Sequence, residues 1–580
     1  MFKEGSTGGC SLKAYQGANM TLLALDLDSA PSEGSFAGFT MGYIAPGQTT
    51  SRLIPNLLNF DGTEGLTESD VSPIQTFKWI HFPGSYKQVV AGVGEYVYQA
   101  TPRYFDSDHK LLPLDPGRTI SVPIDVGDFT KGDLSIGFTR AFLKSQAFST
   151  RYGVGQRLKP KDGGWLFETG EKAGTNKYGD FTWDDMYFWL GYTARRQVYE
   201  MLDTALADDA VEVEMYAYDL NDPGTAQRCL DLGKEGRIRI ILDSADLHTK
   251  PKEDGTPTPE NDFEVRFNEI KEGEAEVFRC KFGRYSHCKI IILKKGGTAF
   301  RVLTGSTNFA VTGLCVNANH TIIFDRPDVA GYYSDVFNTC WKVGQAAPFR
   351  TTEYSTATKS FTDDNLPETE VNFSPHDQAR ANELLDSIRD NVLDPGTESV
   401  LFAVMEMGET SSGSIIPALR ELHKNDAIYT YGVTDKSGGQ ISLYKPGRKE
   451  GLLVDAKKAN RELPPPFQEE ASLGLGHAIH HKFVITNFNR PNARVYCGSS
   501  NLAGGGEKDN GDNLICIKDE DVATAFAIEA LRLTDHYNFR SIGDDGSDDQ
   551  QTMTLDDTGK WVDKFFDPDD IRSVERKLFA

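Results

Sequence analysis

One pattern occurs twice in this chain of 580 residues and limits how the chain can fold. Residues 287–308 read HCKIIILKKGGTAFRVLTGSTN, and residues 480–501 read HHKFVITNFNRPNARVYCGSSN. A constant shift of 193 positions extends the match without a gap, with 12 identities over the 38 residues of 287–324. Such self-similarity indicates an internal duplication, in which two copies of one structural unit form the body of the protein.

The surroundings of each copy alternate strands with helices. Apolar runs at 211–218, 237–244, 399–406 and 427–434 predict strands, and amphipathic runs at 184–209, 222–236, 379–393 and 412–425 predict helices. Alternation of this kind implies crossover connections and largely parallel sheets. The predicted fold class is therefore α/β, with two duplicated units.

The residues before these units follow a different sequence pattern. Short β-rich runs at 20–28, 36–44, 75–82, 96–105 and 119–126 are separated by clusters of Gly, Pro, Ser and Asp, which is typical of a small antiparallel sandwich. Residues 96–105, which follow a strand with Trp79 and precede a Pro-Gly turn, resemble the late strands of fibronectin type III domains, so we expect a fibronectin III- or immunoglobulin-like sandwich. A domain of this type is usually a spacer or a binding module, so we expect a protein partner for it. The predicted domains are residues 1–130 (sandwich), 131–365 (first repeat), 366–545 (second repeat) and 546–580 (acidic linker and C-terminal tail).

Composition sets the broad class. Hydrophobic residues make up 39% of the chain and charged residues 25%, as in ordinary globular proteins. The eight cysteines form no CxxC pair and lie in or beside apolar runs, which predicts buried thiols. No run approaches the 18 apolar residues of a membrane-spanning helix, and the N-terminus lacks the features of a secretory signal, so we expect a cytoplasmic protein.

The net charge of −24 argues against a protein that coats nucleic acid without specificity, because that mode of binding neutralises phosphates with Lys and Arg. It is compatible with one local basic groove. The residues that would line such a groove are Lys281, Arg284, Lys289, Lys294, Lys295 and Arg301.

The residue types in the repeated pattern suit chemistry at phosphorus. In each copy the His and the Lys, one residue apart on a strand, point to the same face of the sheet. A Gly allows the backbone to approach closely, and the following Ser and Asn can bind oxygen atoms. The candidate catalytic residues are His287, Lys289 and Asn308 in the first copy and His480, Lys482 and Asn501 in the second, with Ser306 and Ser499 as candidate substrate-binding residues.

Two such trios that face each other can displace a group at phosphorus. One histidine attacks the phosphorus atom, and the other protonates the leaving oxygen. The Lys and Asn side chains stabilise the charge that develops on the non-bridging oxygens. The need for two halves explains why the pattern is present twice.

The double H-x-K and G-S-x-N pattern, within residues 180–545, resembles the phospholipase D superfamily, the His-Lys-Asp enzymes. The resemblance implies a phosphodiesterase that forms a covalent phosphohistidine without a metal or another cofactor, on a bilobal α/β fold of duplicated α-β-α lobes with a pseudo-twofold active site. Because the duplication places both halves in one chain, no oligomer is needed to complete the site. In the family pattern an Asp usually follows each Lys after four intervening residues. This chain has Lys294 and Asn487 at those two positions. In this respect it is closer to the nuclease and tyrosyl-DNA phosphodiesterase branches.

The resemblance also assigns partners to the two histidines. Eleven residues beyond each motif Asn, where family members carry a residue that orients a histidine, this chain has Asn319 and Asp512. Within each repeat we therefore expect Asn319 to hold His287 and Asp512 to hold His480. A carboxylate raises the pKa of a neighbouring imidazole, so we expect His480 to be the protonated acid and His287 to be the neutral nucleophile.

Several alternatives stay open at this point. A nucleic-acid phosphodiester is the preferred substrate, a phospholipid headgroup is the second candidate, and a non-catalytic module that binds a phosphate ligand or a protein is the third. A zinc site at His477, His480 and His481 is disfavoured because no carboxylate or thiolate stands nearby in the sequence.

Three further predictions concern residues around the motif. Arg301 is expected to be an ion-pair partner at a strand edge, and Lys294 and Lys295 a solvated hairpin tip. His320 is either a residue that supports the site or a satisfied core residue.

Overall fold

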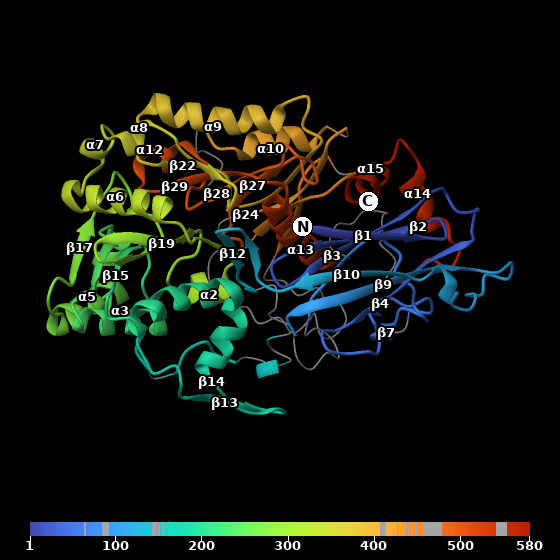
Figure 1. The fold of residues 1–580 in the computed structure, drawn as a ribbon, viewed down its shortest axis with the longest axis horizontal. Helices are drawn as coiled ribbons and strands as arrows, with labels where there is room; N and C mark the ends of the chain where they lie inside the picture. Colours follow the sequence, from blue (N-terminus) through green and yellow to red (C-terminus); the bar gives the residue numbers. More distant parts are fainter. Residues whose placement is uncertain are drawn as a thin grey trace.

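The computed structural model describes residues 1–62, 65–83, 92–141, 148, 151–153, 156–161, 163–405, 413–425, 427–436, 440–447, 449–455, 478–540 and 554–580. An antiparallel β part lies at one end of the molecule, and two large sheets with flanking helices form the rest (Figure 1). None of the described helices is both long enough and apolar enough to cross a lipid bilayer.

The N-terminal part contains two four-stranded antiparallel sheets. In spatial order, one consists of β1 (Phe2–Thr7), β2 (Cys10–Gln16), β3 (Thr21–Leu27) and β8 (Lys78–His81), and the other of β10 (Ile120–Val126), β9 (Gly94–Tyr104), β4 (Phe36–Ile44) and β5 (Arg52–Leu53). A short ribbon, β6 (Pro55–Asn56) with β7 (Thr67–Glu68), and the turn η1 (Pro116–Arg118) complete it. Burial along β10 alternates strictly, as expected for a strand with one face in a core.

The C-terminal segment packs against these N-terminal strands. It contains η4 (Lys560–Val562), α14 (Asp563–Phe566) and α15 (Ile571–Phe579). The ring of Trp561 lies 5.6 Å from that of Phe36, and the ring of Phe565 lies 4.9 Å from that of Phe77. Residues 541–553, which include part of the predicted acidic linker, are outside the described residues.

The first large sheet has eight strands. Their spatial order is β11 (Phe129–Lys131), β12 (Leu134–Phe138), β20 (His320–Phe324), β19 (Thr298–Gly305), β18 (Ile290–Lys295), β15 (Val211–Ala217), β16 (Ile238–Asp243) and β17 (Glu276–Cys280). The main helices of this part are α2 (Trp183–Ala207), α3 (Pro223–Lys234), α5 (Pro259–Ile270) and α6 (Pro327–Val343). Shorter elements are the hairpin β13 (Lys172–Asn176) and β14 (Gly179–Thr182), α4 (Asp246–Thr249), the π-helix η3 (Thr312–Val316), α7 (Ala346–Phe349) and α8 (Glu353–Thr356).

The second large sheet has nine strands. Their spatial order is β21 (Lys359–Asp363), β22 (Leu366–Phe373), β29 (Asn513–Lys518), β28 (Arg494–Gly498), β27 (Lys482–Thr486), β23 (Ser399–Met405), β24 (Tyr429–Lys436), β25 (Gln440–Tyr444) and β26 (Leu452–Asp455). Its described helices are α9 (Gln378–Leu393), α10 (Ile416–His423), α12 (Gly504–Asp509) and α13 (Glu520–Arg540). The first seven strands of the two sheets follow the same order, with β18 at the position of β27 and β19 at that of β28.

The expectation of largely parallel sheets was wrong, because both sheets are mixed. In the first sheet β15 runs parallel to β16, and β16 runs parallel to β17. Among the described strands of the second sheet, only β23 and β24 pair in parallel. The motif strands pair antiparallel, β18 with β19 and β27 with β28. The reason is the short turn inside each motif, since two strands joined by a tight turn must run in opposite directions.

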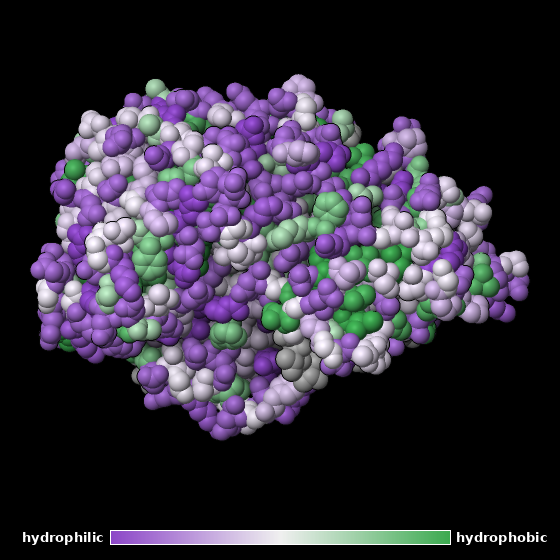
Figure 2. All heavy atoms as spheres, in the orientation of Figure 1, coloured by the Kyte–Doolittle hydropathy of each residue, from purple (hydrophilic) through white to green (hydrophobic). Residues whose placement is uncertain are grey.

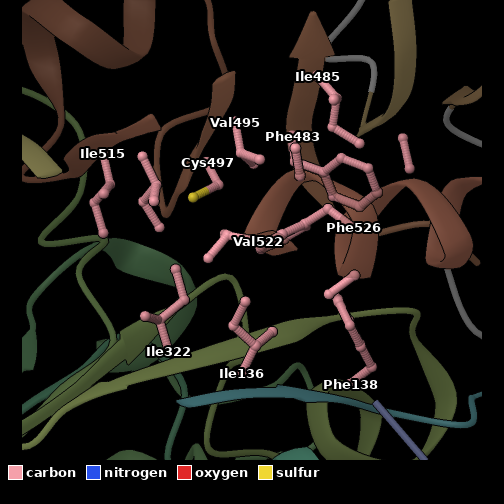
Figure 3. Close-up of a cluster of buried hydrophobic side chains, with 14 of the residues drawn as sticks. Ile136, Phe138, Ile322, Phe483, Ile485, Val495, Cys497, Ile515, Val522 and Phe526 are labelled. Atoms are coloured by element: carbon pink, nitrogen blue, oxygen red, sulfur yellow. The ribbon is translucent and has the colours of Figure 1, made fainter. Parts of the chain in front are cut away.

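A shared core joins the two large sheets. Ile136 and Ile322 of the first sheet pack in one buried cluster with Phe483 and Val495 of the second and with Phe526 of α13 (Figure 3). All eight cysteines are buried and free, which confirms the prediction of buried thiols. Because both sheets contribute to one core, their motif edges are held in a fixed relation.

The surface over the two large sheets differs in hydropathy from the surface over the N-terminal strands. On the face drawn in Figure 2, hydrophilic side chains predominate over the two large sheets, and hydrophobic ones gather over the N-terminal strands.

Candidate active site

The two trios lie at equivalent places in the two sheets. Lys289 directly precedes β18, and His287 lies two residues before Lys289. In the second repeat β27 begins with Lys482, and His480 lies two residues before it. Asn308 and Asn501 follow the ends of β19 and β28. Their exposed fractions are 9% or less, so each trio is nearly enclosed by protein.

Backbone contacts bring the two edges together at one seam. Isolated parallel bridges join Ser286 to Gly511 and Ala318 to Ile479. The backbone N–H of His287 donates to Gly511 O at 2.8 Å, and that of His480 donates to Ala318 O at 3.0 Å. Each histidine is therefore tied to the opposite repeat.

His287 is paired with a carboxylate from the second repeat. Its Nδ1 lies 2.7 Å from Oδ1 of Asp512, which is 1% exposed. Burial lowers the pKa of His287, although Asp512 opposes the shift. Burial alone would raise the pKa of Asp512, but His287 and Lys289 hold it below its usual range. A neutral imidazole therefore donates its Nδ1–H to an ionised carboxylate, and Nε2 is the nitrogen left for chemistry.

His480 is paired with an amide from the first repeat. Its Nδ1 lies 2.8 Å from Oδ1 of Asn319. The amide is held in this orientation, since Nδ2 of Asn319 donates to Gly313 O at 2.8 Å and Ser306 Oγ donates to the same Oδ1 at 2.8 Å. His480 therefore donates its Nδ1–H to a neutral acceptor.

The expected pairing within each repeat was thus wrong, because the partners are crossed. Asn319 and Asp512 come just before β20 and β29, and at these points the backbone pairs with the segment that precedes the histidine of the other repeat. A residue eleven positions beyond the motif Asn therefore reaches across the seam. The sequence indicates which residues orient the histidines, but not which of the two histidines each of them contacts.

The two lysines place two buried ammonium groups beside the histidines. Lys289 Nζ donates to the carbonyl oxygen of His287, and Lys482 Nζ lies 3.3 Å from both ring nitrogens of His480. Burial lowers the pKa of Lys289 to about 8. Burial and then the charge of Lys289 hold the pKa of Lys482 well below its usual value. An anion between the two groups would relieve this penalty, so the site is suited to a phosphate.

The motif asparagines and serines have different surroundings. Among the described residues, Oδ1 of Asn308 and Oδ1 of Asn501 are buried without a hydrogen-bond partner. Ser306 and Ser499 are fully buried, and their hydroxyls accept backbone N–H groups from the start of β20 and from Asn513 of β29. In this state the serines hold the segments that carry the histidine partners, and a role in binding substrate stays a prediction.

His320 supports the second half-site. Its ring stacks on that of His481 with an interplanar angle of 8°, and their Nδ1 atoms are 3.2 Å apart. His481 Nε2 lies 3.0 Å from Glu529 of α13, and Ser306 Oγ lies 3.2 Å from His320 Nδ1. Burial lowers the pKa of both histidines, and the pair is fully enclosed. The contact with Ser306 favours a supporting role over that of a satisfied core residue, because Nε2 of His320 is buried without a hydrogen-bond partner among the described residues.

Four residues near the first half-site were not predicted: Tyr218, Asp219, Asp243 and His248. Asp219 Oδ2 accepts a hydrogen bond from Asn308, and Asp243 Oδ1 accepts one from the backbone N–H of Ser286 at 2.6 Å. Both carboxylates stand at the carboxyl ends of the neighbouring parallel strands β15 and β16. That position is where ligands of α/β sheets gather, and it was the signal that could have identified them.

The basic residues of the first repeat do not line a common groove. Arg301 pairs with Glu200 and Asp325, as predicted. Lys294 is not a solvated tip, because it lies 2.9 Å from the buried carboxylate of Glu214.

Lys295 pairs with Asp208, and Lys281 and Arg284 are exposed on the segment that leads to His287. Of the three-histidine alternative, His477 lies outside the described residues, and His481 is bound to Glu529.

Comparisons with known proteins give distant likenesses. No family model matches the chain, and no curated protein matches it. Among solved structures, it is similar to phosphatidylserine synthase from Haemophilus influenzae (TM-score 0.40, 12% identity, 67% of this chain and 92% of that chain). It is also similar to polyphosphate kinase from Porphyromonas gingivalis (TM-score 0.37, 12% identity, 59% of this chain), of which it spans about half the length (49%).

A further similar structure is Nuc from Salmonella typhimurium, a phospholipase D family member (TM-score 0.21, 18% identity, 26% of this chain and 89% of that chain). Scores and identities this low do not establish an activity.

Proposed function

We propose that this protein is a phosphodiester hydrolase of the phospholipase D kind, with one active site shared by two duplicated lobes, residues 131–365 and 366–545. The matching order of seven strands in the two large sheets supports the duplication. The N-terminal sandwich, residues 1–130, is an accessory domain in this proposal, and its packing with the C-terminal segment makes it an integral part of the molecule.

The observation that carries the proposal is the crossed pair of hydrogen bonds, from His287 to Asp512 and from His480 to Asn319. Attack of His287 Nε2 on phosphorus forms a P–N bond while the P–O bond to the leaving group breaks. Positive charge develops on the attacking ring, and the Asp512 carboxylate stabilises it. A carboxylate partner therefore suits the nucleophile.

An amide partner suits the acid. Doubly protonated His480 donates its Nε2 proton to the leaving oxygen, and the neutral amide of Asn319 does not hold that proton as a carboxylate would. In the second step His480 removes a proton from water, the water oxygen attacks phosphorus, and the P–N bond to His287 breaks. The proposed roles are those expected from the sequence, but the reason is reversed because the partners are crossed.

The remaining members of the trios stabilise charge in this mechanism. Lys289 and Lys482 compensate the charge on the non-bridging oxygens, and the Asn308 and Asn501 side chains complete the set of polar groups around them. These four side chains fill the role that a metal ion has in other phosphodiesterases, so the proposed reaction needs no metal or organic cofactor.

A nucleic-acid phosphodiester is the proposed substrate. The segment before His287 carries the exposed Arg284, whose guanidinium lies 5.3 Å from the centre of the Tyr285 ring. The Tyr285 ring contacts Tyr218, which in turn contacts His287. An aromatic ring and a guanidinium beside a phosphate site are the groups on which unpaired bases stack.

The test is a substrate panel of labelled single-stranded DNA, single-stranded RNA and phosphatidylcholine vesicles, each with excess EDTA. We expect cleavage of an oligonucleotide that EDTA does not change and that His287→Asn abolishes. Cleavage of the lipid alone would replace the nucleic-acid proposal by a phospholipase. If no substrate is cleaved but tungstate binds to the site, a non-catalytic phosphate-binding module is the better account.

A further inference from the structure

The first half-site contains a buried hydrogen-bonded network that the proposed mechanism does not use. Its centre is His248 of α4, which is 2% exposed. His248 Nδ1 lies 2.7 Å from Oδ2 of Asp243, and its Nε2 lies 2.8 Å from Oδ1 of Asp219. Each ring nitrogen thus faces a carboxylate oxygen at hydrogen-bond distance.

The far oxygens of the same two carboxylates lead into the first trio. Asp219 Oδ2 accepts from Nδ2 of Asn308, the motif amide. Asp243 Oδ1 accepts from the backbone N–H of Ser286, the residue before His287, at 2.6 Å. One imidazole therefore connects the amide and the nucleophile of this half-site through two carboxylates.

A ring packs against both ends of this connection. Tyr218 makes edge-to-face contacts with His248 and with His287, each with centroids 4.6 Å apart. Lys289 Nζ lies 4.8 Å from the centre of the Tyr218 ring. The nucleophile, its lysine and the network therefore form one packed unit.

We propose that His248 is a positioning residue of the active site, which fixes Asn308 and the segment before His287 in one geometry by bridging Asp219 and Asp243. This inference rests on the proposed function of the same site. Because an imidazole that faces two carboxylates donates from both nitrogens, the ring is an imidazolium. Burial opposes this charge, but the hydrogen bonds to Asp219 and Asp243 raise the pKa of His248 to about 9.

The charges around His248 agree with this assignment. Asp219 and Asp243 accept its two N–H groups, and the buried carboxylate of Glu260 of α5 adds a third negative group, also held by the backbone N–H of Leu220 at 3.1 Å. Removing the imidazolium would leave buried carboxylates without their cation. Asp219 would then have lost the N–H group of His248 and would interact with the Asn308 amide alone. The stronger pull of Asp219 would turn that amide away from the substrate.

The second half-site offers a partial comparison. Asp435 Oδ2 accepts from the backbone N–H of Ile479, as Asp243 does from Ser286. The segment that would correspond to Asp219, 406–412, lies outside the described residues. The carboxylate that anchors the segment before the histidine is thus common to both halves, and the bridge through His248 to the motif amide is described only for the first.

The experiment is a double-mutant cycle between His248→Gln and Asn308→Ala, with bis(p-nitrophenyl) phosphate as the probe. We expect His248→Gln to lower kcat by about 10- to 100-fold in the wild-type background. In the Asn308→Ala background the loss should be smaller by about 5-fold or more, because only the positioning of the segment before His287 remains to be lost. Equal losses in both backgrounds would overturn the proposal.

A buried histidine of another domain supplies the control. His81 is also 2% exposed and is bound to Tyr98 in the N-terminal part. His81→Gln should lower the thermal stability as His248→Gln does, but it should leave kcat unchanged. A loss of kcat that follows stability in both variants would show that His248 acts through the fold alone.

A readout without activity separates this inference from the proposed function. In ¹⁵N-histidine spectra of the wild-type protein, one buried ring should stay doubly protonated up to about pH 9 and should be absent in His248→Gln. Tungstate affinity can replace kcat in the cycle. If no phosphodiester is cleaved, the proposed function fails, while the spectra and the tungstate cycle still decide the role of His248. A neutral His248 ring at pH 7 would contradict it.

Discussion

The two half-sites have the same trio on equivalent pairs of strands, yet the residues that contact the trios differ. His287 is paired with the Asp512 carboxylate and lies beside the hydrogen-bonded network of His248. His480 is paired with the Asn319 amide and lies beside the stacked rings of His320 and His481. In the proposed mechanism the two sets of reactive groups are alike, and the neighbours of each set assign its task. Four predictions test this difference, beginning with the largest expected effect.

The first prediction concerns the carboxylate. Asp512→Asn removes the charge that stabilises the ring of His287 during attack, and the new amide can present its N–H to the ring and disturb the tautomer. We expect kcat for bis(p-nitrophenyl) phosphate to fall by about 1,000-fold or more, as in other sites where a histidine loses its carboxylate. A loss below about 10-fold would show that the two partners are interchangeable.

The second prediction concerns the amide. Asn319→Asp places a carboxylate 2.8 Å from Nδ1 of His480 and so raises the pKa of that ring. Because the acid must be protonated, the alkaline fall of kcat should move to higher pH by about one unit or more. The measurement is the pH profile for a dinucleotide, whose alkoxide leaving group needs the proton. An unchanged profile would remove His480 from the role of acid.

The third prediction makes the second half-site resemble the first. His481 and His320 correspond by the repeat to Cys288 and Asn513, so the variant is His481→Cys with His320→Asn. The folded pKa of both histidines lies below the value of 6.5 of a free imidazole, so the unfolded chain binds more protons and stability falls as the pH drops below about 6.5.

Each group contributes up to about 1.4 kcal/mol per pH unit in that range. The variant should lose less stability than the wild type between pH 7 and pH 5, measured by chemical unfolding at each pH. Burial lowers the pKa of His81 in the same direction in both proteins, so it cancels in the comparison. An equal loss in the two proteins would show that the pair is not the acid-sensitive element of the seam.

The fourth prediction uses Arg284, which belongs to the first half-site. Arg284→Ala should raise KM for an oligonucleotide by about 3- to 10-fold and make binding less dependent on salt, since one cation that contacts the strand is lost. Hydrolysis of bis(p-nitrophenyl) phosphate, which does not reach that segment, should not change. Equal effects on both substrates would show that Arg284 supports the fold of the site instead of the substrate.

Much of the first half-site and second half-site followed from the repeat. Spacing within the repeat predicted the trios, and the family resemblance predicted the two residues that orient the histidines. Apolar periodicity located β15, β16, β23 and β24 within a few residues. The sequence could not show that the partners cross the seam, because a shift between repeats says nothing about which repeat a side chain faces. The short motif turns also made the sheets mixed where alternation with helices had suggested parallel strands.

Residues without a counterpart in the repeat were the hardest to predict. His248 lies on α4, a single turn, and Glu529 lies on α13, and neither belongs to the motif. Their importance comes from three-dimensional contacts between distant segments, such as Glu529 with His481. A repeat predicts the residues that both copies share, but it does not predict the residues that make the two half-sites different.

The most direct test of the central claim is to trap the covalent intermediate in His480→Asn. Bis(p-nitrophenyl) phosphate has a leaving group that needs no proton, so the first step should proceed while the second, which needs a base, should stop. We predict a burst of one p-nitrophenolate per active site and, after an alkaline quench, a p-nitrophenyl phosphoryl adduct on His287 by peptide mass spectrometry. Steady turnover without a burst, or an adduct on another residue, would contradict the account.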